Sequence, residues 1–194
     1  SISELLTVIT VLAMMLPAAA AVREKERGTI EQLLVSPLTP TQILLPKVVA
    51  MTLVILLGTA LSVFLILQGV FHIPIKGNLA LFFAVTALYT FAMSGLGLFI
   101  STLSRNLAQT TMLTIMIMMP ILLLSGAWTP PEAMLPGIRQ AMYLSPLYYY
   151  IEMSYDILLK GAGLKILWDS LLGLTLLGSA VFGFGVWRFR RQFG

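Results

Sequence analysis

The sequence contains no cysteine and few charged residues for its length. Only 10% of its 194 residues are Asp, Glu, Lys or Arg, whereas 58% are hydrophobic, and the mean hydropathy is +0.95. The lack of cysteine excludes disulfides, thiol catalysis and thiolate metal sites. A soluble domain carries about 25% charged residues, and this chain has too little polar surface to cover a globule in water. The composition therefore predicts an integral membrane protein.

Five hydrophobic runs are long enough to cross a bilayer as helices, which takes about 20 mostly apolar residues. They cover residues 5–22, 48–70, 79–100, 107–124 and 166–187. The runs are apolar on all sides, which excludes the alternating strands of a membrane barrel. The first run lacks a basic leader and ends on charged residues, so it is not a signal peptide. The sequence predicts an all-α integral membrane protein, with residues 1–194 in a single transmembrane domain.

The basic residues are divided unequally between the two sides of the membrane. Four lie on one side and eight on the other, the eight being Arg23, Lys25, Arg27, Lys47, Arg105, Arg188, Arg190 and Arg191. The side with more basic residues is expected to be cytoplasmic, which places the C-terminus inside. The net charge of +4 is then explained by membrane anchoring, and we expect no nucleic-acid partner. Ser1 would lie outside with no preceding signal, so we expect that an earlier helix is missing from this sequence.

A charged and capped segment, residues 23–46, connects the first two hydrophobic runs. Thr29 and Gln32 have the spacing of a capping box, which satisfies free amides at a helix start. The expected apolar face holds Ile30, Leu33 and Leu34. A Ser-Pro step at residues 36–37 ends this helix, and Thr39-Pro40 fits a second helix start. Such a short amphipathic helix could rest on lipid headgroups or dock into a groove on a soluble partner.

This segment carries a resemblance to a known family. The stretch "REKERGTIEQLLVSPLTPTQILLPK" resembles the signature of ABC-2 type permeases, the membrane subunits of ATP-binding-cassette exporters. The matching residues are Arg23, Glu24, Glu26, Gly28, Thr29, Glu31, Leu33, Leu34, Pro37 and Lys47. A second stretch, residues 122–164, resembles the family's block of Ser-Gly, Pro, Met-Pro, Ser/Asn-Pro-Leu and Lys-Gly steps. Pro46 departs from the pattern, which puts in doubt how regularly the next helix begins.

The resemblance implies a six-span permease of the bacterial inner membrane, of which this chain would lack the first span and the extracytoplasmic domain that often follows it. It implies a second permease half, identical or not, and cytoplasmic ATPase subunits that bind ATP and Mg²⁺. No G-x-x-x-x-G-K-[ST] occurs in this chain, so we expect it to bind no cofactor and to be no enzyme itself. The apolar spans suit export of an amphipathic or lipidic cargo and contact with membrane lipid. The ATPase contacts implied for the coupling helix are Arg23, Glu24, Glu26, Gly28, Thr29, Glu31, Gln32, Leu33, Leu34 and Pro37.

Residues 125–164 are too polar and too rich in proline to form one span. They could be an external loop, but we favour a pair of short re-entrant helices that close the outer mouth, one of them starting at Ser145-Pro146. The gate residues would be Trp128, Pro130, Tyr143, Pro146, Tyr149 and Glu152. The aromatic residues of the segment also fit a membrane-interface belt, made of Trp128, Tyr143, Tyr148, Tyr149, Tyr150 and Tyr155.

Two smaller patterns have competing interpretations. Glu152 and Asp156 could act as paired carboxylates, but Asp156 and Lys160 also have the i, i+4 spacing of a helical ion pair, which we favour. In the last hydrophobic run, small residues indicate close helix approach, with Ser179 and Gly183 at small-xxx-small spacing; they are Gly173, Gly178, Ser179, Gly183 and Gly185.

Two other classes of membrane protein fit less well. An intramembrane serine protease would need Gly-x-Ser-Gly and a membrane histidine, but Ala92 replaces the glycine before Ser94 and His72 lies in a loop. An aspartyl protease would need a Gly-x-Gly-Asp beside Tyr155-Asp156, and the sequence has none. An ATP-independent channel or carrier would need ionisable residues inside its spans, which hold only Asp169, near an end.

Overall fold

The computed structural model describes residues 2–28, 35, 37–38 and 40–193, and these fold as helices and connecting loops without a strand. The long helices are α1 (Ile2–Glu26), α3 (Pro40–Leu61), α4 (Leu79–Leu103), α5 (Leu107–Leu124) and α8 (Leu164–Phe193). α3 continues directly into the π-helix η1 (Ser62–Val70). The short elements between α5 and α8 are η2 (Pro131–Ala133), α6 (Pro136–Ala141), η3 (Met142–Leu144) and α7 (Pro146–Lys160). The all-α class is confirmed.

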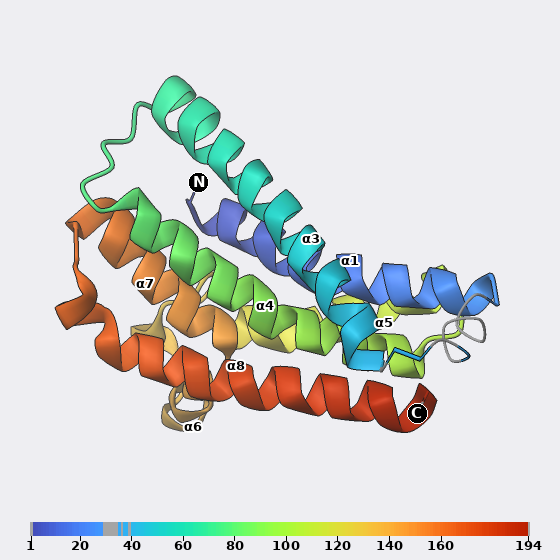
Figure 1. Cartoon of the computed structure of the whole chain (residues 1–194). Coiled ribbons are helices and arrows are strands. Elements are labelled where there is room, and N and C mark those ends of the chain that lie inside the picture. Colours follow the sequence, from blue (N-terminus) through green and yellow to red (C-terminus); the bar gives the residue numbers. More distant parts are fainter. Residues whose placement is uncertain (1, 29–34, 36, 39, 194) are drawn as a thin grey trace.

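Five helical stretches in the described part of the chain are long and apolar enough to span a membrane. They are Ile2–Glu26, Leu45–Val70, Leu79–Leu103, Leu107–Leu124 and Leu164–Gln192. The two ends of the chain lie at opposite ends of the bundle, as an odd number of spans requires (Figure 1). α1 runs to Glu26, about one turn beyond the predicted end at residue 22, so charged residues occupy its last turn.

The helix α4 lies at the centre of the bundle because glycines let its neighbours approach closely. A Cβ at Gly95 would collide with the backbone of Phe182 in α8, and one at Gly185 would collide with the carbonyl of Gly95. On the other side, a Cβ at Gly97 would collide with the carbonyl of Met14 in α1. Backbone contact this close is typical of membrane helices, where small residues replace the hydrophobic effect as the basis of packing.

The sequence predicted five small residues of the last hydrophobic run at close helix contacts, and the structure confirms some of them. Ser179 and Gly183 are exposed, and nothing lies within 4 Å of a Cβ built at Gly183. Gly178 and Gly185 face α4 instead, where a Cβ at Gly178 would lie 2.7 Å from Cβ of Ala92. The prediction of close approach is therefore confirmed for Gly178 and Gly185, and for Gly173 against the Tyr149 ring, but it is wrong for the small-xxx-small pair: the glycines that contact α4 are seven residues apart, which is about two turns of the same face.

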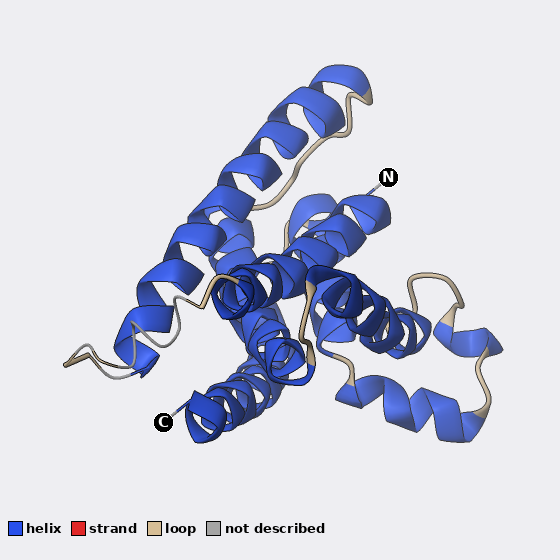
Figure 2. Cartoon of the chain, turned by 90° about the vertical axis from the view of Figure 1, so that its right-hand side faces the viewer, coloured by secondary structure: helices blue, strands red, loops and turns tan. Residues whose placement is uncertain are grey.

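The helix α3 begins at Pro40, as predicted, and passes through Pro46 without ending. It leans away from the other helices toward its η1 end (Figure 2). A hollow of about 310 Å³ lies there, lined by Glu4, Leu5 and Val8 of α1 and by residues of η1 and the loop after it. The outward face of α3 and η1 is apolar and suited to contact with lipid, with Leu53, Val54, Leu57, Leu61, Phe64 and Leu65 exposed.

Candidate functional site

The five consecutive charges at the end of α1, the last of them just beyond the helix, are divided between two directions. Glu24 and Lys25 are partly buried, whereas Arg23, Glu26 and Arg27 are exposed. The division follows from helix geometry, because successive residues point about 100° apart and two neighbours can face the bundle while the rest face away. The predicted coupling residues therefore fall into an inward and an outward group.

Glu24 forms an ion pair with Lys47 of α3. The pair joins the last turn of α1 to the second turn of α3, across the two ends of the segment predicted to be the coupling helix. Its surroundings are apolar: Pro17, Ala21 and Leu98 line the same small space between α1, α3 and α4. Glu24 was predicted to contact an ATPase, and the structure gives it a partner within the chain.

Lys25 holds the end of α4. Its ammonium group donates to the carbonyl of Ser101 and, at 3.3 Å, to the carbonyl of Ser104. The last carbonyls of a helix lack partners within the helix and carry partial negative charge, so a cation is favourable there. The side-chain amide of Gln192 in α8 donates to the carbonyl of Thr102 at 3.1 Å. α1, α4 and α8 are thus tied together at the end of the bundle that carries these charges.

The middle of the predicted coupling helix, with Thr29, Ile30, Glu31, Gln32, Leu33 and Leu34, lies outside the described residues. Gly28 has a φ of +70°, in the left-handed region that glycine adopts at least cost. It lies two residues after the end of α1. Beyond the gap, Val35, Pro37 and Leu38 are exposed, with Val35 at 86% and Leu38 at 53%. Exposed apolar side chains therefore follow the outward charges in the sequence.

At the other functional region, α7 is built into the bundle core. One face of α7 is fully buried against α1, α4, α5 and α8, and it comprises Leu147, Tyr150, Met153, Ser154, Ile157 and Leu158. The predicted helix start at Pro146 is confirmed. The Ser145 hydroxyl was expected to cap this helix, and this expectation is wrong. The hydroxyl donates instead to the carbonyl of Ile121 in α5 at 3.1 Å.

Two buried tyrosines connect α7 to the scaffold. The rings of Tyr150 and Tyr89 in α4 are stacked, with centroids 4.2 Å apart and planes 14° from parallel. The Tyr150 hydroxyl shares a hydrogen bond of 2.7 Å with Thr86, and the Tyr89 hydroxyl shares one of 2.7 Å with Thr10 in α1. The interface-belt interpretation is therefore wrong for Tyr150, which has no exposed surface.

Sequence reasoning missed Tyr89 and its two threonine partners altogether. A signal was available, because Thr10 and Thr86 lie well inside hydrophobic runs, where a hydroxyl needs a partner. Tyr150 also falls on the helical period set by Leu147, Ser154 and Ile157, which predicts one buried face.

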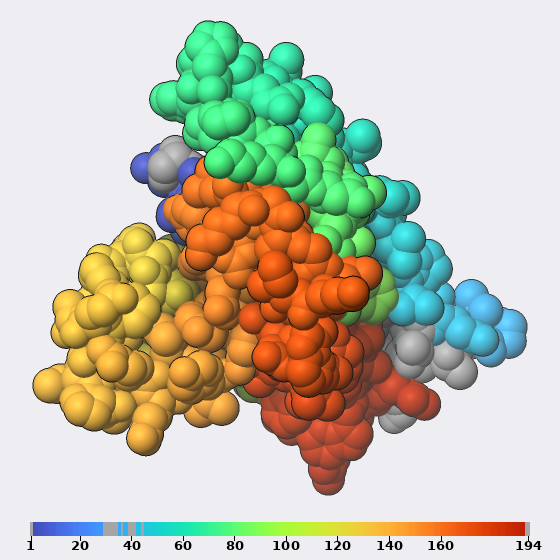
Figure 3. Space-filling model, turned by 90° about the vertical axis from the view of Figure 1, so that its left-hand side faces the viewer, coloured from blue at the N-terminus to red at the C-terminus, as the bar shows by residue number. Residues whose placement is uncertain are grey.

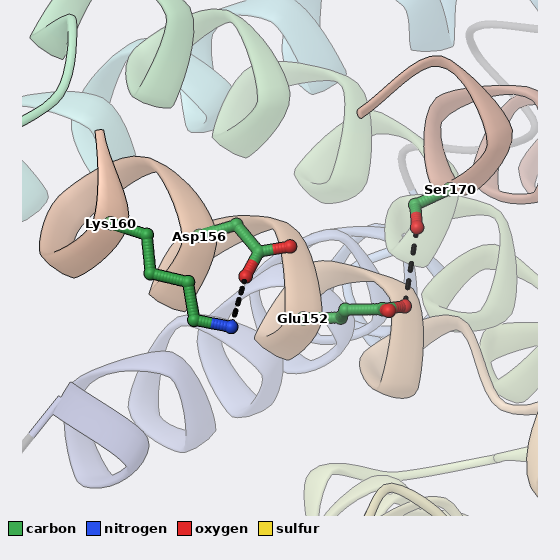
Figure 4. Close-up of polar contacts among 4 residues, drawn as sticks. All are labelled: Glu152, Asp156, Lys160 and Ser170. Atoms are coloured by element: carbon green, nitrogen blue, oxygen red, sulfur yellow. Dashed lines mark hydrogen bonds and ion pairs between the residues drawn. The ribbon is translucent and has the colours of Figure 1, made fainter. Parts of the chain in front are cut away.

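The two acidic residues of α7 have separate partners (Figure 4). Asp156 pairs with Lys160 at 3.1 Å, which confirms the predicted i, i+4 pair, and Glu152 accepts a hydrogen bond of 3.2 Å from Ser170 in α8. Partial burial, followed by the charge of Glu152, raises the pKa of Tyr148 to about 12, so this phenol stays protonated at neutral pH. The carboxylates support packing of α7 and do not form a pair with each other.

The remaining predicted gate residues lie on the surface side of the same region. Trp128, Pro130 and Tyr143 are exposed, and α6 has no buried residue. Tyr149 is partly buried and donates to the carbonyl of Tyr143 at 2.8 Å. The segment thus contains two short helices, as predicted, but only α7 is inside the bundle.

The far end of α7 meets the loop between η1 and α4. The amide of Lys76 donates to the carbonyl of Leu158 at 3.0 Å, and a Cβ at Gly77 would collide with the carbonyl of Ile157. Figure 3 views this end, where the loop (green) lies against the orange part of the chain that includes the end of α7. Gly161, with a φ of +67°, ends α7 there in the left-handed conformation typical of a helix C-terminus.

The structure gives the residues of the protease alternatives ordinary packing roles. Ser94 is buried and its hydroxyl donates to the carbonyl of Phe91 in its own helix at 2.5 Å. His72 is exposed in the loop after η1, and Asp156 is engaged by Lys160.

Comparison with known proteins agrees with this architecture. Residues 3–159 match the family described as "ABC-2 type transporter". Over 186 residues the chain is 38% identical to "Inner membrane transport permease YhhJ" of Escherichia coli (strain K12), which covers 96% of this chain and 50% of that protein. It is 34% identical over 192 residues to "Probable multidrug ABC transporter permease YbhR" of the same strain, covering 98% of this chain and 52% of the relative. "ABC transporter G family member 20" of Dictyostelium discoideum is 26% identical over 162 residues, covering 82% of this chain and 22% of the relative. The chain spans about half the length of the bacterial relatives it matches.

Proposed function

The chain belongs to the ABC-2 type transporter family, and from this premise we propose that it is the membrane-spanning part of an exporter subunit driven by a separate ATPase. ATP and Mg²⁺ bind to that cytoplasmic partner, and a second permease half, identical or not, completes the transport pathway. The protein lies in a bacterial inner membrane with its C-terminus in the cytoplasm. The cargo is amphipathic or lipidic and moves outward.

The observation that carries the proposal is the composition of the surface where α1 ends. Arg23, Glu26 and Arg27 are exposed beside Gly28, and Val35 and Leu38 are exposed shortly after. Charged residues next to exposed apolar ones are typical of a protein interface, in which the apolar side chains supply affinity and the charges set register. This surface supports docking of the ATPase against residues 23–46.

The region around α7 supports a role at the opposite, outer end of the pathway. A helix of 15 residues is shorter than a span, yet its inner face is completely buried among the spanning helices. Backbone that does not span is tolerated at membrane depth only when protein covers it. We therefore assign α7 as a re-entrant helix, with Tyr149 and Glu152 near the outer gate and Trp128, Pro130 and Tyr143 at its surface.

The proposal is tested by the double substitution Leu33→Asp with Leu34→Asp in the full-length permease. Full burial of two leucines is worth roughly 3–6 kcal/mol, part of which a docked ATPase would recover. We expect ATPase recovered with the permease to fall at least about tenfold, since about 1.4 kcal/mol corresponds to a factor of ten. Permease-dependent stimulation of ATP hydrolysis and export should be lost with it. The measurement is pull-down from membranes that contain equal amounts of permease.

The matched control is Leu33→Met with Leu34→Met, which keeps the apolar face and should keep ATPase binding. Equal recovery by the aspartate variant, with transport and stimulation intact, would show that the segment rests on the membrane surface and is no ATPase contact.

A further inference from the structure

The ion pair between Glu24 and Lys47 joins the two ends of the coupling segment, residues 23–46. We infer that Glu24 and Lys47 are positioning residues: together they form a strap that makes α1 and α3 move as one body when the ATPase displaces residues 25–46. This inference rests on the proposed function and deepens it, because it divides the predicted coupling residues into those that touch the partner and those that transmit its motion.

The position of the pair supports this division. Glu24 lies in the last turn of α1 and Lys47 in the second turn of α3, so the strap closes the segment between them into a loop with joined ends. The side chains of Lys47 and Glu24 are 37% and 24% exposed, so neither is free to reach far into the surroundings. The strap therefore prevents one helix from moving without the other.

Because its surroundings are apolar, the pair is stable only when the two residues carry opposite charges. Ala21 and Val48 are buried next to it, and Pro17 and Leu98 line the same space. Attraction between charges is stronger where water is partly excluded, and removal of one partner leaves the other partly buried and uncompensated. Two like charges at these positions would repel each other and push the ends of the helices apart.

The arrangement of α3 explains why a strap matters at this end. At the other end of the pair of helices, α1 and η1 border the hollow of about 310 Å³, and α3 leans outward (Figure 2). Val48 and Thr52 are buried near the strap, and Ile55, Thr59, Val63 and Leu67 continue this buried face toward the hollow. The strap lies at the end of α3 opposite the hollow, and Lys25 transmits the same motion to α4, because its ammonium group is bonded to carbonyls at the end of that helix.

The test is a charge-swap cycle in the full-length permease expressed with its ATPase: Glu24→Lys, Lys47→Glu and the double variant. We expect each single substitution to lower transport per ATP hydrolysed at least about tenfold, while ATPase recovery in pull-down stays within about twofold of wild type. The double variant restores an opposite pair and should bring transport back to within about threefold of wild type. A structural defect alone would lower membrane levels and ATPase recovery as well.

Glu26→Lys is the matched control, since it makes the same charge change two residues away on the outward side of α1. It should lower ATPase recovery, and Lys47→Glu should not rescue it. If Glu24→Lys or Lys47→Glu does not reach the membrane, the neutral variants Glu24→Gln and Lys47→Gln are measured in their place. The double swap must still fold and transport.

A double swap no better than the worse single variant overturns the inference, as do single variants that transport like wild type. The melting temperature of the purified permease gives a readout that does not depend on the ATPase: the singles should lower it and the double should restore it. If wild-type permease binds no ATPase, the proposed function fails, whereas the thermal cycle still decides whether the two residues form a strap.

Discussion

Two segments of this chain interrupt the series of spans, and they are held in opposite ways. The buried face of α7 is joined to the core through uncharged groups, with the Tyr150 ring stacked on Tyr89 and each hydroxyl paired with a threonine. The described ends of the coupling segment are joined to the bundle through charged contacts, which Glu24 makes with Lys47 and Lys25 makes with the end of α4. One segment is held by buried packing, and the described ends of the other are held by charge.

The difference indicates how each segment responds to force. Aromatic packing in a close-packed interior resists displacement in every direction, so α7 should move only with the helices around it. The Glu24–Lys47 ion pair and the hydrogen bonds of Lys25 fix the described ends of the coupling segment at the edge of the bundle. The proposed function uses both properties: a stiff region around α7, and a charged attachment through which the motion of an ATPase would reach the helices.

The largest effect is expected when α7 is released from the core by Tyr150→Ala. Removal of a large buried aromatic side chain costs about 3–5 kcal/mol, because the transfer energy is lost and a cavity remains. The Tyr89 hydroxyl keeps its Thr10 partner, but its ring loses the stack. We expect the free energy of unfolding in mixed detergent micelles to fall by that amount. A cysteine placed at Met153, which has no exposed surface in the wild type, should become accessible to aqueous thiol reagents.

Tyr150→Phe is the matched control, because it keeps the ring and removes only the hydroxyl that bonds Thr86. A hydrogen bond between membrane helices averages about 0.6 kcal/mol, so this variant should lose roughly that amount and keep Met153 shielded. If both variants unfolded at the wild-type detergent concentration, α7 would be no part of the core, and the contrast between the two segments would fail.

The sequence was sufficient to predict the helices but not the faces by which they meet. The number of spans, the helix starts at Pro40 and Pro146, and the Asp156–Lys160 pair follow from local rules of hydropathy, proline geometry and helical spacing. The small residues of the last run correctly indicated close helix approach, but which of the five face α4 did not follow, because they lie on different sides of α8 and only the position of α4 decides which are used. Gly178 and Gly185 were chosen by packing, not by spacing.

The same limit explains the charged end of α1. The run of charges correctly indicated the edge of a span, but a sequence does not state which way each side chain points. The inward direction of Glu24 and Lys25 depends on where α3 and α4 lie, and these contacts are between residues far apart in the chain. A family signature therefore combines residues with separate roles, and three-dimensional placement is needed to separate them.

A smaller loss than that of Tyr150→Ala is expected from Lys25→Met, which keeps the length of the side chain and removes its charge. A hydrogen bond to a charged group is worth about 1.5–3 kcal/mol when both partners are shielded, and Lys25 is only partly buried, so we expect about 1–2 kcal/mol. Lys25→Arg keeps a donor at the end of α4 and should lose at most about half as much. The measurement is again unfolding in detergent. A loss of less than about 0.3 kcal/mol for Lys25→Met would mean that the charged contacts hold the ends of the coupling segment no more firmly than water does.

The smallest effect is expected for Lys160→Gln, which removes the ion pair at the exposed end of α7. The Lys160 side chain is 76% exposed, and a helical i, i+4 pair in water contributes about 0.3–0.5 kcal/mol. Asp156 loses a cation but keeps its backbone carbonyl bonded to the amide of Ala162 at 2.9 Å, so the end of α7 should stay closed.

Gly161→Ala, one residue further along, should cost more, about 1–2 kcal/mol, because alanine is strained at a φ of +67°. Unfolding of the two variants side by side separates charge from backbone conformation. If Lys160→Gln lost more than Gly161→Ala, α7 would depend on a charged contact as the coupling segment does, and the distinction between the two segments would have to be withdrawn.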